Sequence, residues 1–242
     1  MSGPRVSVVV PARDEAENLP PLVAEIAAAL AGSSFEVIVV DDGSVDGTGA
    51  VLARLAAGEP RLRVVGHDRP GGQSAAIASG FAVARGRLLV TIDGDGQNDP
   101  ADIPRLLAAL EEGAPAVGLV AGERRERHTS AAKRLASRLA NRLRAAALGD
   151  GVADSGCGLK AIDAALAHRL PYFAGFHRFL PALALAEGRE IRRVPVADRP
   201  RRAGRSKTGI LDRAMAAGLD LLGVWWLTRR RRGRPRATER RD

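Results

Sequence analysis

Stretches rich in valine and isoleucine alternate with stretches rich in alanine and leucine, and this alternation limits the fold of the chain more than any other feature. The first kind predicts strands at Val6–Val10, Phe35–Val40, Leu62–Gly66, Leu88–Ile92, Ala116–Ala121 and Ile191–Val196. The second kind predicts helices at Asn18–Leu30, Gly47–Ala57, Gln73–Ala84 and Ile103–Glu112. Strands that are apolar throughout and separated by helices form a mostly parallel sheet covered on both faces. The sequence therefore predicts an α/β fold.

Polar loops follow three of these strands, after Val10, Val40 and Ile92. In open α/β sheets ligands bind beyond the carboxyl ends of the strands, so these loops are the expected site. The third loop carries two carboxylates one residue apart, Asp93 and Asp95. Their like charges repel unless a cation or a hydrogen-bond cage compensates them. Carboxylate and amide oxygens suit Mg²⁺ or Mn²⁺, which usually complete their coordination with water and substrate phosphates, so a diphosphate substrate is predicted.

The loop after the second strand contains Asp41 and Asp42, and either carboxylate can reach a ribose or a base. Ser44 and Asp46 in the same loop have two open interpretations, because Ser and Asp also cap helix N-termini.

Composition places the chain among globular proteins, with 242 residues, 45% hydrophobic and 27% charged. A single cysteine, Cys157, fits a reducing compartment. The N-terminus enters a strand almost at once without the pattern of a secretory signal, and no apolar run approaches the ~20 residues that span a bilayer. We therefore expect a cytoplasmic protein.

The net charge of +9 is concentrated at the C-terminus, where residues 229–242 hold eight arginines against Glu239 and Asp242. Aromatic residues, at 3%, are too few for base stacking, and no recognition helix is evident, so nucleic acid is not the expected partner. An anionic membrane surface fits better. The preceding segment Gly209–Thr228 reads as an amphipathic helix that ends in Trp225-Trp226, directly before the arginines. This order predicts a helix in the membrane interface; the alternative is a helix docked on the domain with a solvated tail.

Basic residues gather in two other segments. Residues 130–148 have a helical pattern whose cations, Lys133 and Arg134 among them, are expected to form a solvated face. Arg124 lies just beyond a predicted strand end. The loop 199–207, with Arg201 and Lys207, is expected to return to the site and neutralise phosphate oxygens. The glycine-rich segment 150–160 is either a site wall or a plain turn.

Four motifs in this order resemble glycosyltransferase family 2, in particular dolichol-phosphate mannosyltransferase and the bacterial polyprenyl-phosphate glycosyltransferases. They are Val8-Val9-Val10-Pro11-Ala12-Arg13-Asp14-Glu15, Val39-Val40-Asp41-Asp42-Gly43-Ser44, Asp93-Gly94-Asp95-Gly96-Gln97-Asn98-Asp99-Pro100 and Gly204-Arg205-Ser206-Lys207. The resemblance covers nearly everything from Val6 to Lys207. Two positions depart from the family pattern: Arg13 replaces an aromatic or small residue, and Gly94 replaces a common alanine. Many bacterial relatives add two transmembrane helices after the catalytic domain, and this chain is expected to reach its lipid from the surface.

The resemblance implies a GT-A (Rossmann-like) fold, a UDP- or GDP-linked sugar donor, and Mg²⁺ or Mn²⁺ held by the Asp-x-Asp motif. By position, it implies donor-binding roles for Pro11, Arg13, Glu15, Val40, Asp42, Gly94, Gln97, Arg201 and Lys207. It implies metal ligation by Asp93, Asp95 and Gln97, and catalytic roles for Asp93, Asp95, Arg124 and Asp154. Acceptor-phosphate contacts are expected from Lys133, Arg134 and Ser155.

The reaction expected from these features is inverting transfer of a sugar from its nucleotide to a polyprenyl phosphate, on the inner face of the cell membrane. Two alternatives remain open: transfer to a saccharide hydroxyl in envelope polysaccharide synthesis, with Asp154 as base, and a non-catalytic membrane-surface binding protein. The expected organisation is a GT-A domain over 1–208, an amphipathic helix over 209–228 and a disordered arginine-rich tail over 229–242.

Overall fold

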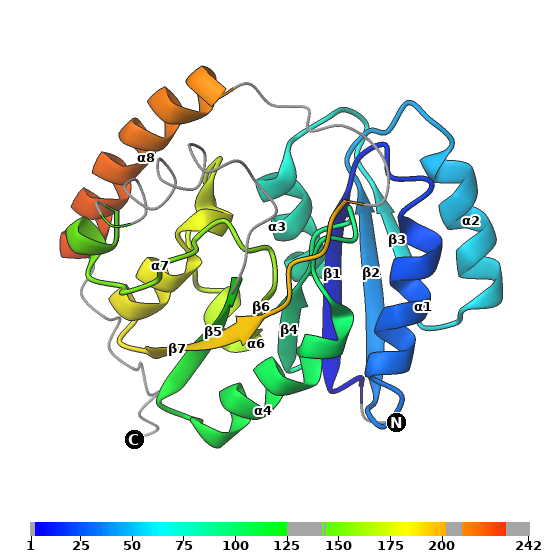
Figure 1. Cartoon of the computed structure of the whole chain (residues 1–242), viewed down its shortest axis with the longest axis horizontal. Helices are drawn as coiled ribbons and strands as arrows, with labels where there is room; N and C mark the ends of the chain where they lie inside the picture. Colours follow the sequence, from blue (N-terminus) through cyan, green and yellow to red (C-terminus); the bar gives the residue numbers. More distant parts are fainter. Residues whose placement is uncertain (1–2, 125–141, 143, 202–209, 231–242) are drawn as a thin grey trace, which may run out of the picture.

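The computed structural model of the chain describes residues 3–124, 142, 144–201 and 210–230, with the backbone alone over 210–217 (Figure 1). Within these residues, seven strands form one sheet in the order β3-β2-β1-β4-β6-β5-β7. Their bounds are β1 Val6–Ala12, β2 Phe35–Asp41, β3 Leu62–Gly66, β4 Leu88–Thr91, β5 Val117–Arg124, β6 Lys160–Asp163 and β7 Glu190–Val196. All neighbours pair in parallel except β6, which is antiparallel to both β4 and β5. The α/β prediction is confirmed.

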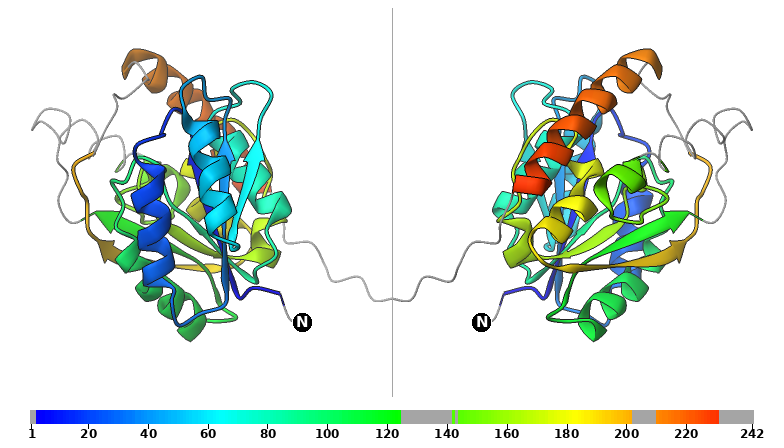
Figure 2. Two further views of the ribbon diagram at one scale, coloured as in Figure 1. Left: turned by 90° about the vertical axis from the view of Figure 1, so that its right-hand side faces the viewer. Right: turned by 90° about the vertical axis from the view of Figure 1, so that its left-hand side faces the viewer.

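Helices cover both faces of the sheet (Figures 1 and 2). Alternate residues of β1 serve the two faces, because successive side chains of a strand point in opposite directions. Val8 and Val10 join a core cluster with α1 and α4, whereas Val9 packs against α3, α6 and α7 on the other face. These helices are α1 Leu19–Ala29, α2 Thr48–Gly58, α3 Gln73–Val83, α4 Ile103–Glu112, α6 Ala164–Ala167 and α7 Leu180–Ala186, with 3₁₀ turns η1 Pro100–Asp102 and η2 Phe176–Arg178.

The six predicted strands and the four predicted helices of the first half are all present, with ends displaced by a few residues. The helix expected over 130–148 lies mostly outside the described residues; 142 and 144–148 are helical. Strand β6 and helices α6 and α7 were missed. Strand β6 matters for function, because it brings the glycine-rich segment 150–160 beside the carboxyl end of β4.

The C-terminal helix α8, Ile210–Arg230, lies against α7 at the opposite end of the molecule from β3 (Figure 1). Val224 is buried there with Phe179 and Leu183, while Leu221 and Leu227 are half-buried beside them. Among the described residues, no helix combines the length and the apolar character needed to cross a membrane. The expected division at 208 and 228 stays a prediction.

Candidate active site

The loops after β1 and β2 are tied together by side chains of the β2 loop. The Ser44 hydroxyl accepts a hydrogen bond from the Asp14 amide at 2.8 Å, and the Thr48 hydroxyl accepts one from the Glu15 amide at 2.9 Å. The Asp14 carboxylate in turn accepts from the Val45 amide at 2.8 Å. Asp14 is held at φ 52°, which this network of contacts supports. Ser44 therefore fixes the neighbouring loop, whereas Asp46 accepts from the Thr48 amide at the start of α2.

Asp42 faces the start of α3, where it accepts three hydrogen bonds. The amides of Gly71 and Gly72 each donate to its carboxylate at 2.7 Å, and His67 Nδ1 lies 2.7 Å from Oδ1. Burial alone would raise the pKa of Asp42, but these contacts lower it below its ordinary value. In this structure the buried Asp42 carboxylate is hydrogen-bonded to the protein itself. Its contact with a base or ribose of the donor stays a prediction.

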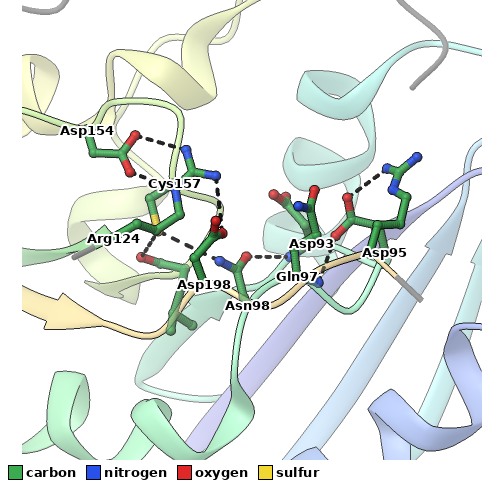
Figure 3. A network of polar contacts seen from close by, with 10 residues as sticks. Asp93, Asp95, Gln97, Asn98, Arg124, Asp154, Cys157 and Asp198 are labelled. Atoms are coloured by element: carbon green, nitrogen blue, oxygen red, sulfur yellow. Dashed lines mark hydrogen bonds and ion pairs between the residues drawn. The ribbon is translucent and has the colours of Figure 1, made fainter. Parts of the chain in front are cut away.

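Asp93 and Asp95 lie in the loop that follows β4, at the carboxyl edge of the sheet next to β1. Gly94 between them is tight against the first loop, since a Cβ there would lie 2.9 Å from the carbonyl oxygen of Pro11. Gly96 takes φ 73°, a conformation that glycine adopts at low cost. The backbone amide of Gln97 then donates a hydrogen bond to Asp95 Oδ1 at 3.1 Å. Glycine at both positions lets the chain fold back and present the two carboxylates together (Figure 3).

Cationic and amide groups surround the two carboxylates. Arg201 Nη2 lies 2.7 Å from Asp95 Oδ2 and 3.9 Å from Glu15 Oε1, and Gln73 Nε2 donates to Asp93 Oδ1 at 2.7 Å. Burial, followed by the charge of Asp95, raises the pKa of Asp93 to about 6, even though neighbouring cations oppose the shift. Arg201 was predicted to reach this site, and the structure places it there.

Lys160, the first residue of β6, is a buried cation beside this pair that sequence reasoning left without a role. Its ammonium group donates to the Cys157 carbonyl, and its side chain is 3% exposed. Burial lowers its pKa, while the charge of Asp93 acts in the opposite direction. The sequence signal for this role was a lysine inside the apolar run 159–162, because a buried lysine needs a charged or hydrogen-bonding partner.

A second polar cluster lies next to the first, around Arg124 at the end of β5 (Figure 3). Arg124 donates to both carboxylate oxygens of Asp154 at 2.7 and 3.0 Å, and its Nη1 lies 3.6 Å from Asp198. Burial alone would lower the pKa of Arg124, but its hydrogen bonds and the acidic charges raise it. Asn98 lies between the Asp93 cluster and the Arg124 cluster. Its side-chain oxygen accepts a hydrogen bond from the backbone amide of Asp93 at 3.4 Å, and its side-chain nitrogen contacts Cys157 Sγ at 3.8 Å.

The donor atoms around Asp93 suit a hard divalent cation. Burial raises the pKa of Asp93 and the charge of Asp95 adds to this rise, and a cation bound between the two carboxylates would oppose both effects. In the part of the chain that the structure describes, no group of three or more His, Cys, Asp or Glu forms a metal site. The carboxylates of Asp93 and Asp95, with the Gln97 side chain as the predicted third ligand, would leave the other coordination positions to water and a diphosphate, as is usual for Mg²⁺.

The remaining predicted residues divide into three groups. Pro11 and Glu15 lie at the site beside Gly94 and Arg201, and Arg13 is exposed in the same loop. Val40 is fully buried in a core cluster with Ile38 and Ala76, so its side chain does not line the open site. Ser155 is buried next to Asp154. Lys133, Arg134 and Lys207 lie outside the described residues.

The sequence model of Glycosyl transferase family 2 matches residues 7–170, a range that contains the Asp93–Asp95 pair and most of its surroundings. The chain belongs to this family. The fold is accordingly GT-A, and three of the four motifs lie at or just beyond the carboxyl ends of β1, β2 and β4.

Two curated relatives show the branch that the chain resembles. It is 38% identical over 207 residues to the undecaprenyl-phosphate 4-deoxy-4-formamido-L-arabinose transferase of Enterobacter sp., matching 84% of this chain and 62% of the relative. It is 37% identical over 231 residues to the dodecaprenyl-phosphate galacturonate synthase of Rhizobium johnstonii, matching 93% of this chain and 67% of the relative. The chain thus spans about two thirds of the length of these relatives.

A solved structure has the same fold as this chain. Glucosyl-3-phosphoglycerate synthase from Mycobacterium tuberculosis, in complex with Mn²⁺, UDP and glucosyl-3-phosphoglycerate, superimposes with a TM-score of 0.71 at 25% identity. The match covers 93% of this chain and 80% of that protein. A protein of this fold therefore holds a divalent metal together with a nucleoside diphosphate.

Proposed function

We propose that this chain transfers a sugar from a UDP- or GDP-linked donor to a polyprenyl phosphate, with inversion at the anomeric carbon. The observation that carries this proposal is the pair Asp93 and Asp95 at the sheet edge, with Arg201 already beside it. Both curated relatives are named for polyprenyl-phosphate substrates or products, which supports the acceptor class. Because the acceptor is a membrane lipid, we place the reaction at a membrane surface, with the protein peripheral on the cytoplasmic face.

Asp93 and Asp95, with the Gln97 side chain, are the residues that would hold Mg²⁺ or Mn²⁺ between the protein and the donor diphosphate. When bound, the metal supplies positive charge that stabilises the departing nucleoside diphosphate. Gln73 orients the Asp93 carboxylate by its hydrogen bond. Arg201, bound to Asp95 at 2.7 Å, is close enough to exchange this carboxylate for a phosphate oxygen of the donor.

The group transfer is a single displacement at the anomeric carbon. An oxygen of the acceptor phosphate forms a bond to this carbon from the side opposite the leaving group. The bond from the carbon to the donor phosphate oxygen breaks, and the nucleoside diphosphate leaves with the electron pair. Because the acceptor phosphate is already anionic, the step needs no side chain to remove a proton.

Transfer to a saccharide hydroxyl needs a general base, and the structure weakens the candidate for that role. Both oxygens of Asp154 accept hydrogen bonds from Arg124, which disfavours protonation of this carboxylate. We therefore propose that Arg124 and Asp154 act as a fixed pair that shapes the wall of the site. Lys133, Arg134, Ser155 and Lys207 stay as predicted contacts of the acceptor and donor phosphates.

The test is a transfer assay with a panel of labelled UDP- and GDP-sugars, each with Mg²⁺ or Mn²⁺, against two acceptors. One acceptor is polyprenyl phosphate in detergent and the other is 3-phosphoglycerate in water. We expect chloroform-extractable label from one donor with the lipid acceptor. Label in the aqueous phosphoglycerate product alone would contradict the proposed acceptor while keeping the transferase chemistry.

A further inference from the structure

Helix α8 has two different faces over residues 218–230, where the structure describes its side chains. One face is docked on the domain: Val224 is 2% exposed against Phe179 and Leu183 of the α7 region. The opposite face is open, with Leu219 73%, Leu222 65% and Trp226 56% exposed. These three residues follow at intervals of three and four, so they form one stripe along the helix.

The open stripe ends in a cationic and aromatic cluster. The Arg229 guanidinium lies 4.4 Å from the ring centroid of Trp225, and that of Arg230 lies 5.3 Å from the ring centroid of Trp226. Both arginines are exposed. Within residues 218–230 the one acidic side chain, Asp220, lies close to Gly175 on the docked side, since a Cβ on Gly175 would be 2.7 Å from its carboxylate. The open face is thus apolar and positive.

We propose that the open face of α8, formed by Leu219, Leu222, Trp225, Trp226, Arg229 and Arg230, docks the protein on an anionic lipid bilayer. A docked helix with tryptophan and arginine on its outer face has the composition of an interfacial helix, with apolar side chains for the acyl boundary and cations for the headgroups. The sequence from residue 229 to 242 carries a net charge of +6, so the chain is strongly basic where this helix ends. A second copy of the chain fits less well, because it would bring the same arginines together.

The proposal resolves the two alternatives for this segment. The helix both docks on the domain and presents a membrane face, because the two roles use opposite sides of it. The proposal rests on the proposed function for its purpose, since a transferase held at the bilayer reaches a lipid-linked phosphate without crossing the membrane. Binding to the bilayer can nevertheless be measured with neither donor nor acceptor present.

Trp225 and Trp226 are the two tryptophans of the chain, so its intrinsic fluorescence reports on this face directly. The experiment mixes the full chain with vesicles of phosphatidylcholine alone or with a substantial fraction of phosphatidylglycerol, both free of polyprenyl phosphate. We expect the anionic vesicles to sediment the protein and to shift tryptophan emission to shorter wavelength. We also expect brominated acyl chains to quench the emission.

The double variant Leu219→Glu/Leu222→Glu keeps both tryptophans and changes two exposed side chains, so the fold should survive. We expect its affinity for anionic vesicles to fall by about tenfold or more, because two apolar contacts become charged. Val64→Glu, at the 43% exposed Val64 on β3, is the matched control and should bind as the parent does.

Three results would overturn the proposal: no binding to anionic vesicles, equal binding by the double variant, or sedimentation without any tryptophan shift. The last result would assign binding to the arginine tail alone. If the protein self-associated through this face and did not bind vesicles, the face would instead be assigned to contact with a second copy of the chain. None of these results bears on whether sugar transfer occurs, so this test and the transfer assay fail independently.

Discussion

At the residue scale, Gly158 leaves the space in which the Asp93 carboxylate lies. A Cβ at Gly158 would be 2.3 Å from the carboxyl group of Asp93, whereas a Cβ at Gly156 would meet nothing closer than 3.6 Å. We expect Gly158→Ala to displace Asp93 and to weaken binding of Mn²⁺ by about tenfold, at a cost of about 1–3 kcal/mol in the free energy of unfolding. Titration with Mn²⁺ measures this. Gly156→Ala is the control, and equal Mn²⁺ affinities in the two variants would contradict the account.

Arg201 would compete with a bound metal for Asp95, because it already pairs with this carboxylate, and Arg199 offers a matched comparison. Arg199 pairs with Glu25 at 2.7 Å and Asp99 at 2.6 Å, so it holds acids that belong to no metal site. We expect Arg201→Met to tighten binding of Mn²⁺ alone by about threefold, because a part-exposed ion pair is worth up to about 1 kcal/mol. The same variant should bind a nucleoside diphosphate with Mn²⁺ more weakly.

Calorimetric titration of Mn²⁺, with and without UDP or GDP, measures both effects. Arg199→Met should leave both affinities near those of the parent. If Arg201→Met weakened Mn²⁺ binding in the absence of nucleotide, Arg201 would be supporting the carboxylates rather than competing for them.

Residues with a local signal could be predicted from the sequence, and those whose partners are distant could not. Asp93 and Asp95 stand out because two acids follow an apolar strand. Lys160 and Gln73 approach Asp93 from segments 67 and 20 residues away, and each has an ordinary local explanation, in a strand and at a helix start. Only the assembled sheet shows that they share a site.

At the scale of elements, Asp42 joins the end of β2 to the start of α3. Its carboxylate accepts from the amides of Gly71 and Gly72, and His67 holds it from the side. We expect Asp42→Ala to lower the free energy of unfolding by about 2–3 kcal/mol, because buried amides lose their acceptor. Urea denaturation measures this. Asp41→Ala removes one acceptor, for the Ser44 amide, and should cost about 1 kcal/mol; equal losses would contradict the role given to Asp42.

Elements were predictable where their residues were mostly apolar, as in the four-residue strand β4. Strands β1 and β2 are seven residues each and almost wholly apolar, which is why they were found. Strand β6 is four residues long, begins with Lys160 and follows a glycine-rich segment, so its sequence resembles a loop. Its place between β4 and β5 comes from pairing with strands distant in the sequence, which no local pattern encodes.

At the scale of the whole molecule, His177 makes stability depend on pH. Partial burial of its ring, and then the charges of Lys160 and Arg178, lower its pKa to about 3, and Nδ1 lies 2.7 Å from the Ser74 hydroxyl. Between about pH 6.5 and pH 3 the unfolded chain takes up a proton at this residue and the folded chain does not. The contribution of His177 to the free energy of unfolding is therefore fully present above pH 6.5, and it is lost progressively as the pH falls toward 3.

The loss from one such proton is at most about 1.4 kcal/mol per pH unit. We expect His177→Gln to flatten the fall in unfolding free energy between pH 6.5 and pH 4, measured by urea denaturation at each pH. The exposed His168, changed to Gln, is the control for the substitution itself. Parallel curves for the parent and His177→Gln would show that His177 titrates alike in both states.

The parallel sheet was predictable from the sequence, whereas for the C-terminal helix the sequence did not decide between docking on the domain and lying in a membrane interface. The parallel half of the sheet follows from the strand and helix pattern, whereas the docking of Val224 on α7 depends on a helix, Leu180–Ala186, that the pattern did not reveal. Only the structure shows which side of α8 is docked on the domain and which side is exposed.

Lipid-linked transfer by Asp95→Asn is the sharpest test of the proposed active site, with Asp99→Asn as the matched control. Both acids pair with an arginine of the same segment, Asp95 with Arg201 and Asp99 with Arg199, but Asp95 alone belongs to the proposed metal pair. With the donor that labels the polyprenyl phosphate, we predict that Asp95→Asn loses chloroform-extractable product by at least about a hundredfold, while Asp99→Asn keeps most of it. Substantial transfer by a folded Asp95→Asn would contradict the assignment of this site.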